Sequence, residues 1–328
     1  MNRVVDTWDR FQIPLYITAL IAGVVVGLRW SGSADIFEAA INPSLMALLY
    51  ATFLGIPLTR VGGALKDLKF LTVLLAVNFI AVPIVAFVLS RFIAGSDALL
   101  VGFLLVVLAP CIDYVIVFSG LAGAAQEKLL AATPMLMLAQ IVLIPVFLAL
   151  FVGSDILGSI SFGPFVEAFF LLIIIPLVAA GITQWVAGKW QVGRTIMSVA
   201  EAIMVPLMML TLFVVIASQV EAVSDQFTHI VKVVPLYFTF LIVMIPVGCG
   251  LSKLGGLGVK ETRAVVFSGA TRNSLVVLPL ALALPAGLEI AAVVVVTQTL
   301  VELIGMVIYV RIIPLIFPKR RPTANSQV

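Results

Sequence analysis

The sequence is poor in charged side chains. Asp, Glu, Lys and Arg make up 11% of its 328 residues, whereas an ordinary soluble domain has about 25%. Apolar residues make up 62% of the chain, and the mean hydropathy is +1.25. So few charges exclude a soluble enzyme, a nucleic-acid binder and a disordered scaffold. The apolar runs are also unbroken, which excludes the alternating pattern of an outer-membrane barrel. The composition therefore predicts an all-α polytopic membrane protein.

Residues that carry chemistry are also scarce. The two cysteines, Cys111 and Cys249, form no Cys-x-x-Cys pair, and the single histidine, His229, is predicted in an outer loop. Zinc and disulfide frameworks are therefore not supported. The sequence contains no phosphate-binding loop, no His-Glu-x-x-His motif and no Gly-x-Ser-x-Gly elbow. We expect a protein that is not an enzyme and has no cofactor and no resident metal.

Ten segments are long and apolar enough to cross a bilayer, which takes about 20 residues. The short gaps between them leave no room for a soluble domain, and residues 319–328 are predicted to form a cytoplasmic tail. The ten segments are 11–29, 36–58, 68–91, 97–124, 126–152, 163–187, 195–219, 231–252, 261–285 and 287–316.

The basic residues predict the orientation of these spans. With a cytoplasmic N-terminus, fifteen of the 19 Lys and Arg residues fall in inner segments, and only Arg29, Arg91 and Lys232 fall in outer ones. The remaining one, Arg272, lies inside a span. Basic residues gather on the cytoplasmic side of membrane proteins, so we expect a multi-pass plasma-membrane protein with both termini in the cytoplasm.

Prolines indicate an internal repeat. Ile13-Pro14-Leu15 recurs at Ile175-Pro176-Leu177, and Pro43 and Pro83 recur at Pro206 and Pro246. Residues 1–155 are therefore predicted to form one five-span unit and residues 160–318 a second one. Because each unit has an odd number of spans, the two units have opposite orientations. Inverted repeats of this kind are typical of secondary transporters.

Corresponding places in the two units carry residues that weaken a helix. Pro110 lies midway along the fourth span, and the polar run from Gly269 to Ser274 lies midway along the ninth. Proline removes a backbone hydrogen bond and clashes with the preceding turn. Two discontinuous helices in matching positions indicate a transport site. The alternative interpretation is a simple proline kink and a polar patch that packs helices together.

Three ionisable residues lie deep in the predicted spans: Asp113, Arg272 and Glu302. Charges at that depth are costly and are usually functional. Asp113 and Arg272 form a structural ion pair in one interpretation. In the other, Arg272 meets a polar or anionic substrate and Asp113 exchanges a proton. Glu302 is either a proton carrier or a neutral, hydrogen-bonded packing group.

Two smaller features leave alternatives open. Cys111 follows Pro110 and is either a small buried residue or a soft ligand, because thiolates select soft metals and metalloids. Gly23-x-x-x-Gly27 in the first span indicates close helix packing, within the chain or between two copies. Glu201 lies near a span end and is expected at the membrane interface.

The ten spans, the break at Ala109-Pro110-Cys111 and Asn273 in the ninth span resemble the bile acid/arsenite transporter superfamily, which has the bile acid:sodium symporter fold. Val301-Glu302 in the tenth span is similar to its arsenical-resistance permease branch. The resemblance implies a panel domain of spans 1, 2, 6 and 7 and a core domain of spans 3–5 and 8–10. It also implies that spans four and nine cross in the core and that substrate binds between the domains.

The resemblance ties Cys111 to trivalent metalloid transport and matches Glu302 to a glutamate of the last span. The chain departs from its relatives after Asn273, where Ser274 and Leu275 replace the usual acidic residue. The missing carboxylate argues against a sodium site at this place and against strict specificity for arsenite.

The first functional hypothesis is proton-coupled efflux of trivalent arsenite or antimonite. In it Cys111 holds the metalloid, and the proton moves through Glu302 and Asp113. The hydroxyl groups of the substrate would meet Thr271, Asn273 and Ser274, with Arg272 as a further binding residue.

The second hypothesis is a sodium- or proton-coupled symporter of an organic anion. Arg272 would then meet the anion, and oxygens of Asn78, Thr133 and Asn273 would meet a coupling ion. A sensor or assembly subunit without transport is a third possibility, and the paired breaks argue against it. In each case the lipid bilayer is a partner and nucleic acid is not, and the sequence does not set the oligomeric state.

Overall fold

The computed structural model of this chain describes residues 2–30, 34–55, 67–112, 114–153, 170–225, 227–285 and 287–318. Asp113 and the tail from 319 to 328 lie outside the described residues. The helices within them are α1 (Asn2–Arg29), α2 (Ala34–Gly55), α4 (Leu68–Ala76), η2 (Val77–Ala81), α5 (Val82–Ser90), η3 (Arg91–Ile93), α6 (Asp97–Val107), α7 (Tyr114–Leu121), α8 (Gln126–Val152), η4 (Phe170–Ile174), α11 (Ile175–Lys189), α12 (Gln191–Asp225), α13 (Phe227–Leu254), α14 (Val259–Ala270), α15 (Ser274–Leu282) and α16 (Ile290–Ile316).

The described part of the chain is all-helical, which confirms the predicted fold class at that level. Six of its helical segments are long and apolar enough to cross a membrane. They are Ile36–Gly55, Leu68–Ile93, Gln126–Val152, Gln191–Ser218, Val231–Leu254 and Ile290–Ile316. Pro14–Arg29 and Asp97–Val107 are shorter apolar helices. A total of ten spans in two inverted repeats stays a prediction.

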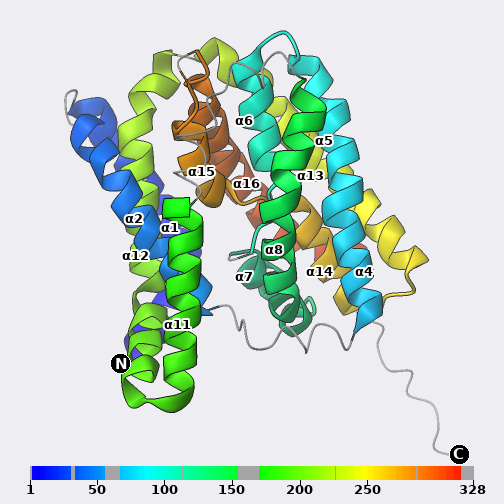
Figure 1. Cartoon of the computed structure of the whole chain (residues 1–328). Coiled ribbons are helices and arrows are strands. Elements are labelled where there is room, and N and C mark those ends of the chain that lie inside the picture. The colour runs from blue at the N-terminus through cyan, green and yellow to red at the C-terminus, as the bar shows by residue number, and fades with distance from the viewer. Residues whose placement is uncertain are drawn as a thin grey trace, which may run out of the picture.

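The helices pack as two groups (Figure 1). Helices α1, α2, α11 and α12 pack on one another and form the four-helix group. The helices from α4 to α8 and from α13 to α16 form the second group, here called the crossing group. Few contacts join the two groups, mainly those of α16 and α13 with α12 and of α15 with α2. Their equivalence to a panel and a core domain stays a prediction.

Small residues bring α1 close to α12 in the four-helix group. A Cβ atom on Gly23 would lie 2.9 Å from the carbonyl oxygen of Phe213, and one on Gly27 would lie 2.6 Å from that of Ala217. Both distances are too short for a side chain. The glycine pattern of the first span therefore serves packing within the chain.

Pro83 explains a π-turn in the crossing group. Proline has no N–H to donate to the preceding turn, and Val82 instead donates its N–H to the carbonyl oxygen of Val77. The wider turn, η2, is of a kind frequent at functional sites. It carries Asn78, whose side chain is fully buried.

The two predicted breaks cross each other. Helix α6 ends at Val107, and α14 ends at Ala270. Pro110 and Arg272 then pair as an isolated antiparallel bridge. Cys111 donates its N–H to the carbonyl oxygen of Thr271 at 3.1 Å, and Asn273 donates its own to that of Ala109 at 2.8 Å. Unwound backbone is tolerated at membrane depth only where its polar groups are satisfied in this way. We call residues 109–111 and 271–273 the crossing.

Candidate functional site

Arg272 lies at the centre of the crossing and is fully buried. Its Nη2 atom donates to the Asn78 Oδ1 atom at 2.9 Å and to the carbonyl oxygens of Gly269, at 2.8 Å, and Ser268. Its Nη1 atom donates to the carbonyl oxygen of Val107 at 3.3 Å. The ring of Phe240 lies 5.7 Å from the guanidinium carbon. The positive charge is therefore held by oxygens from three separate segments.

Asn78 is itself fixed from two sides. Its Nδ2 atom donates to the carbonyl oxygen of Leu74 and to the Oγ atom of Ser268, each at 3.0 Å. These bonds orient Oδ1 toward Arg272. The predicted pair of Asp113 with Arg272 lies outside the described residues, because Asp113 is not among them.

Glu302 binds the backbone of the crossing. Its Oε2 atom accepts the N–H of Arg272 at 2.8 Å and a further bond from Nε2 of Gln298, one turn earlier on α16. Its side chain is 1% exposed. Glu302 therefore ties the tenth predicted span to the break in the ninth.

The other predicted site residues gather at the same place and are buried. Asn273 caps α15 by accepting the N–H of Val276 on Oδ1 at 3.2 Å, while its Nδ2 atom has no hydrogen-bond partner among the described residues. Ser274 shares a 2.7 Å hydrogen bond with Thr299. The Thr271 hydroxyl donates to the carbonyl oxygen of Phe267, one turn earlier, and contacts the sulfur of Met306 at 3.8 Å. Cys111 is fully buried and forms no disulfide.

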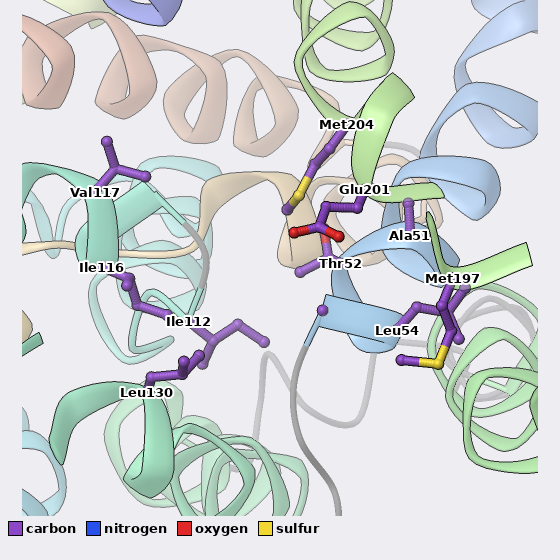
Figure 2. A pocket seen from close by; sticks show the side chains of 11 residues that line it. Ala51, Thr52, Leu54, Ile112, Ile116, Val117, Leu130, Met197, Glu201 and Met204 are labelled. Carbon is purple, nitrogen blue, oxygen red and sulfur yellow. The ribbon is translucent and has the colours of Figure 1, made fainter. Parts of the chain in front are cut away.

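A pocket lies between the two helix groups, beside the crossing (Figure 2). Its volume is about 390 Å³. Helices α2 and α12 supply one wall. Ile112 supplies the other wall together with α7 and α8. The lining residues are Ala51, Thr52, Leu54, Gly55, Met197, Glu201 and Met204 on the first wall and Ile112, Ile116, Val117 and Leu130 on the second.

Among the described residues, two polar side chains line this pocket, and both are on the wall of the four-helix group. Figure 2 shows the Glu201 carboxylate close to Thr52 and Met204. Thr52 is 2% exposed, and its hydroxyl has no hydrogen-bond partner among the described residues. Buried hydroxyl groups ordinarily have such a partner, so a solute with a polar group could supply it.

The structure separates the predicted site residues from this pocket. Cys111, Thr271, Arg272, Asn273 and Ser274 come together at the crossing, and none of them lines the pocket, which the chain reaches at Ile112. Sequence reasoning assigned Glu201 to the interface and did not single out Thr52. The charge of Glu201 at a span end was the signal that could have identified it as a pocket residue. Thr52 lies in an apolar run, and the sequence around it gave no such signal.

A crossing of two discontinuous helices beside a pocket between two helix groups defines a class of membrane protein, the secondary transporters. The family model described as Sodium Bile acid symporter family matches residues 42–226, more than half of the chain, and the chain belongs to this family. No curated protein matches the chain.

Membership in this family indicates the general function of the protein. The chain is a multi-pass membrane protein that transports a small solute, and its family points to sodium as the coupling ion. Members of this family are transporters, which is consistent with a protein that is not an enzyme.

Proposed function

We propose that the protein exports a small uncharged solute across the plasma membrane by alternating access, and that trivalent arsenite or antimonite is this solute. The pocket between the two helix groups supports the proposal. Trivalent arsenite and antimonite are uncharged trihydroxides near neutral pH. Their hydroxyl groups can form hydrogen bonds with the Glu201 carboxylate and the Thr52 hydroxyl. The thioether sulfurs of Met197 and Met204 also line this pocket, and sulfur ligands suit soft elements.

Charge favours an uncharged solute over an anion. Glu201 is the one charged side chain among the described residues that line this pocket. An anion there would face the Glu201 carboxylate across a lining that is mostly apolar, and like charges repel strongly at short range. The Arg272 guanidinium lies outside the lining, and its hydrogen bonds go to Asn78, Val107, Ser268 and Gly269.

The packing of the two groups supports movement between them. Contacts within each group far outnumber those between the groups, and the crossing holds its own group together through backbone hydrogen bonds. Rigid-body movement of one group against the other is the usual form of alternating access. The pocket has one wall on each group, so such movement would open it to either side of the membrane.

Glu302 is our proposed carrier of the coupling proton, with Asp113, two residues after Cys111 in sequence, as a second carboxyl. A hydrogen bond to a charged carboxylate is about twice as strong as one between neutral groups. Protonation of Glu302 would therefore weaken its bond with the N–H of Arg272 and loosen the crossing. Cys111, next to the lining residue Ile112, is proposed to meet the metalloid as the groups move.

An organic anion is the second candidate, because the description of the family names bile acids. In this alternative Arg272 would have to exchange its present hydrogen bonds for the anion, with sodium or a proton as the coupling ion. The apolar part of the pocket would suit the body of such a solute.

Everted membrane vesicles distinguish the two candidates. Vesicles that contain the protein should accumulate arsenite when a proton gradient is imposed, and Cys111→Ser should abolish this while leaving the amount of membrane protein unchanged. A labelled bile acid should not accumulate under a sodium gradient. Sodium-stimulated uptake of the bile acid without arsenite accumulation would reverse the assignment.

A further inference from the structure

The oxygens around Arg272 are arranged as the ligands of a small cation. Four oxygen atoms accept hydrogen bonds from the two terminal nitrogens of the guanidinium: Oδ1 of Asn78 and the carbonyl oxygens of Val107, Ser268 and Gly269. Ser268, Gly269, Asn78 and Arg272 are all fully buried. We call these four atoms the oxygen cage.

Three of the four oxygens belong to ends of broken helices. Val107 is the last residue of α6, and Ser268 and Gly269 lie in the last turn of α14. Carbonyl oxygens at a helix C-terminus have no partner within the helix, and they carry the negative end of the helix dipole. Half-helix C-termini and unwound carbonyls are the groups that hold sodium ions in secondary transporters.

A sodium ion does not fit the cage while Arg272 is there. The guanidinium nitrogens already occupy the positions from which a cation would contact these oxygens, at 2.8 to 3.3 Å for Gly269, Asn78 and Val107. A second positive charge within about 4 Å would also be repelled by several kcal/mol in such a buried place. The family points to sodium coupling. In this chain, the Arg272 guanidinium supplies the positive charge at this position.

We propose that Arg272 is a covalently attached replacement for a sodium ion at the crossing. Its guanidinium supplies permanently the charge that a bound ion would supply reversibly. The wild-type protein therefore needs no sodium at this place, either to close the crossing or to move solute. Removal of the guanidinium leaves the oxygen cage in place and converts it into a sodium site. This inference goes beyond the proposed function, because cation binding can be measured without any transport.

Sodium binding by purified protein tests the proposal. We compare the wild type with Arg272→Gln, which removes the charge and keeps a polar side chain, and with Arg272→Lys, which keeps the charge. Arg91→Gln removes an exposed arginine and controls for the loss of one positive charge. The readouts are equilibrium binding of ²²Na⁺ and thermal unfolding in 150 mM sodium chloride or choline chloride.

Arg272→Gln should bind one more sodium ion per chain than the wild type, and sodium should raise its Tm by about 2 °C or more. The wild type, Arg272→Lys and Arg91→Gln should show no added ion and no such shift. Equal sodium binding by Arg272→Gln and the wild type would overturn the proposal. Should Arg272→Gln fail to fold in both salts, the same comparison is made with Arg272→Gln combined with Asn78→Asp, which adds a carboxylate to the cage. A negative result would leave the solute assignment untouched.

Discussion

The side chains of Asn78 and Arg272, 194 positions apart in sequence, meet at 2.9 Å between Oδ1 and Nη2. This contact joins the π-turn before Pro83 to the break after α14. It also fixes the direction in which the buried guanidinium points, because Asn78 is held in turn by Leu74 and Ser268.

Replacement of Asn78 by leucine should therefore destabilise the protein. The change leaves a buried donor on Arg272 without its acceptor, which costs about 1–3 kcal/mol. Thermal unfolding in detergent should show a lower Tm. Ser218→Ala is the control, because the Ser218 hydroxyl donates to the carbonyl oxygen of Val215 within its own helix, and its loss should shift Tm little. An unchanged Tm in Asn78→Leu would contradict the role of this contact.

Thr52→Val should separate solute binding from stability. Because the Thr52 hydroxyl has no hydrogen-bond partner among the described residues, its removal should leave Tm unchanged or slightly higher. Loss of one hydrogen bond to solute should weaken arsenite affinity by about 3- to 10-fold. Transport kinetics and thermal unfolding measure the two effects.

Thr211→Val is the matched control for that change. The Thr211 hydroxyl donates to the carbonyl oxygen of Leu207 at 2.9 Å and to that of Ser44 on α2 at 3.4 Å. Its loss removes a bond between two helices and should lower Tm while the affinity stays the same. If Thr52→Val lowers Tm and keeps full affinity, the hydroxyl is structural and does not meet the solute.

Glu201→Gln should weaken the binding of an uncharged hydroxyl-bearing solute, because a hydrogen bond to a charged acceptor is the stronger kind. We expect a rise in KM of about 10-fold or more, from a loss of about 1.5–3 kcal/mol. Glu38→Gln changes another exposed glutamate that does not line the pocket, and it should leave KM unchanged. Tighter binding by Glu201→Gln would favour the organic anion.

Asp67 allows a test of pH dependence outside the membrane spans. Its carboxylate caps α4 at Phe70 and accepts a hydrogen bond from the Lys128 Nζ atom at 2.5 Å, and this Lys128 bond lowers the pKa of Asp67 below its ordinary value of 3.8. Lys128 also donates to Glu261, so α4, α8 and α14 are joined near their N-terminal ends.

The lowered pKa means that the ion pair stabilises the folded protein above pH 3.8, and that this contribution is lost as the pH falls through the lower folded value. Asp67→Asn keeps the helix cap and removes the charge. It should cost up to about 1 kcal/mol near neutral pH, because both partners are partly exposed. The difference in Tm from the wild type should shrink as the pH falls below about 3.8, and it should disappear only below the lower folded pKa. A constant difference across this range would contradict the ion pair.

The breaks were the most predictable part of the site. Pro110 cannot donate a backbone hydrogen bond, and the polar run from Gly269 to Ser274 is out of place in a span, so both signals are local. The family resemblance added the crossing itself, which the bridge between Pro110 and Arg272 now shows. The helical class and the long spans followed equally directly from apolar runs.

The partner of Arg272 and the place of the pocket were less accessible. Three of the guanidinium bonds to described residues go to backbone carbonyls, which every residue has. Another goes to Asn78 through packing that the sequence does not encode locally. The sequence predicted that the Asn78 oxygen would bind a coupling ion. In the structure, this oxygen accepts a hydrogen bond from Arg272. Glu201 near a span end is compatible with lipid, water or a pocket, and only the packing of α12 against α2 decides among them.

If the solute binds in the pocket between the helix groups, a side chain that fills this pocket should stop transport. Gly55 lines the pocket, and a Cβ atom there would have no neighbour within 4 Å among the described residues. Gly55→Trp should therefore place an indole ring in the pocket without disturbing the fold. Gly95 has equally open surroundings and does not line the pocket, so Gly95→Trp is the matched control.

The measurement is arsenite accumulation by everted vesicles that contain equal amounts of each variant, with a proton gradient imposed. We expect Gly55→Trp to abolish accumulation while its Tm stays within about 2 °C of the wild type, and Gly95→Trp to accumulate arsenite normally. Accumulation by Gly55→Trp at the wild-type rate would contradict the account, as would no accumulation by the wild type itself.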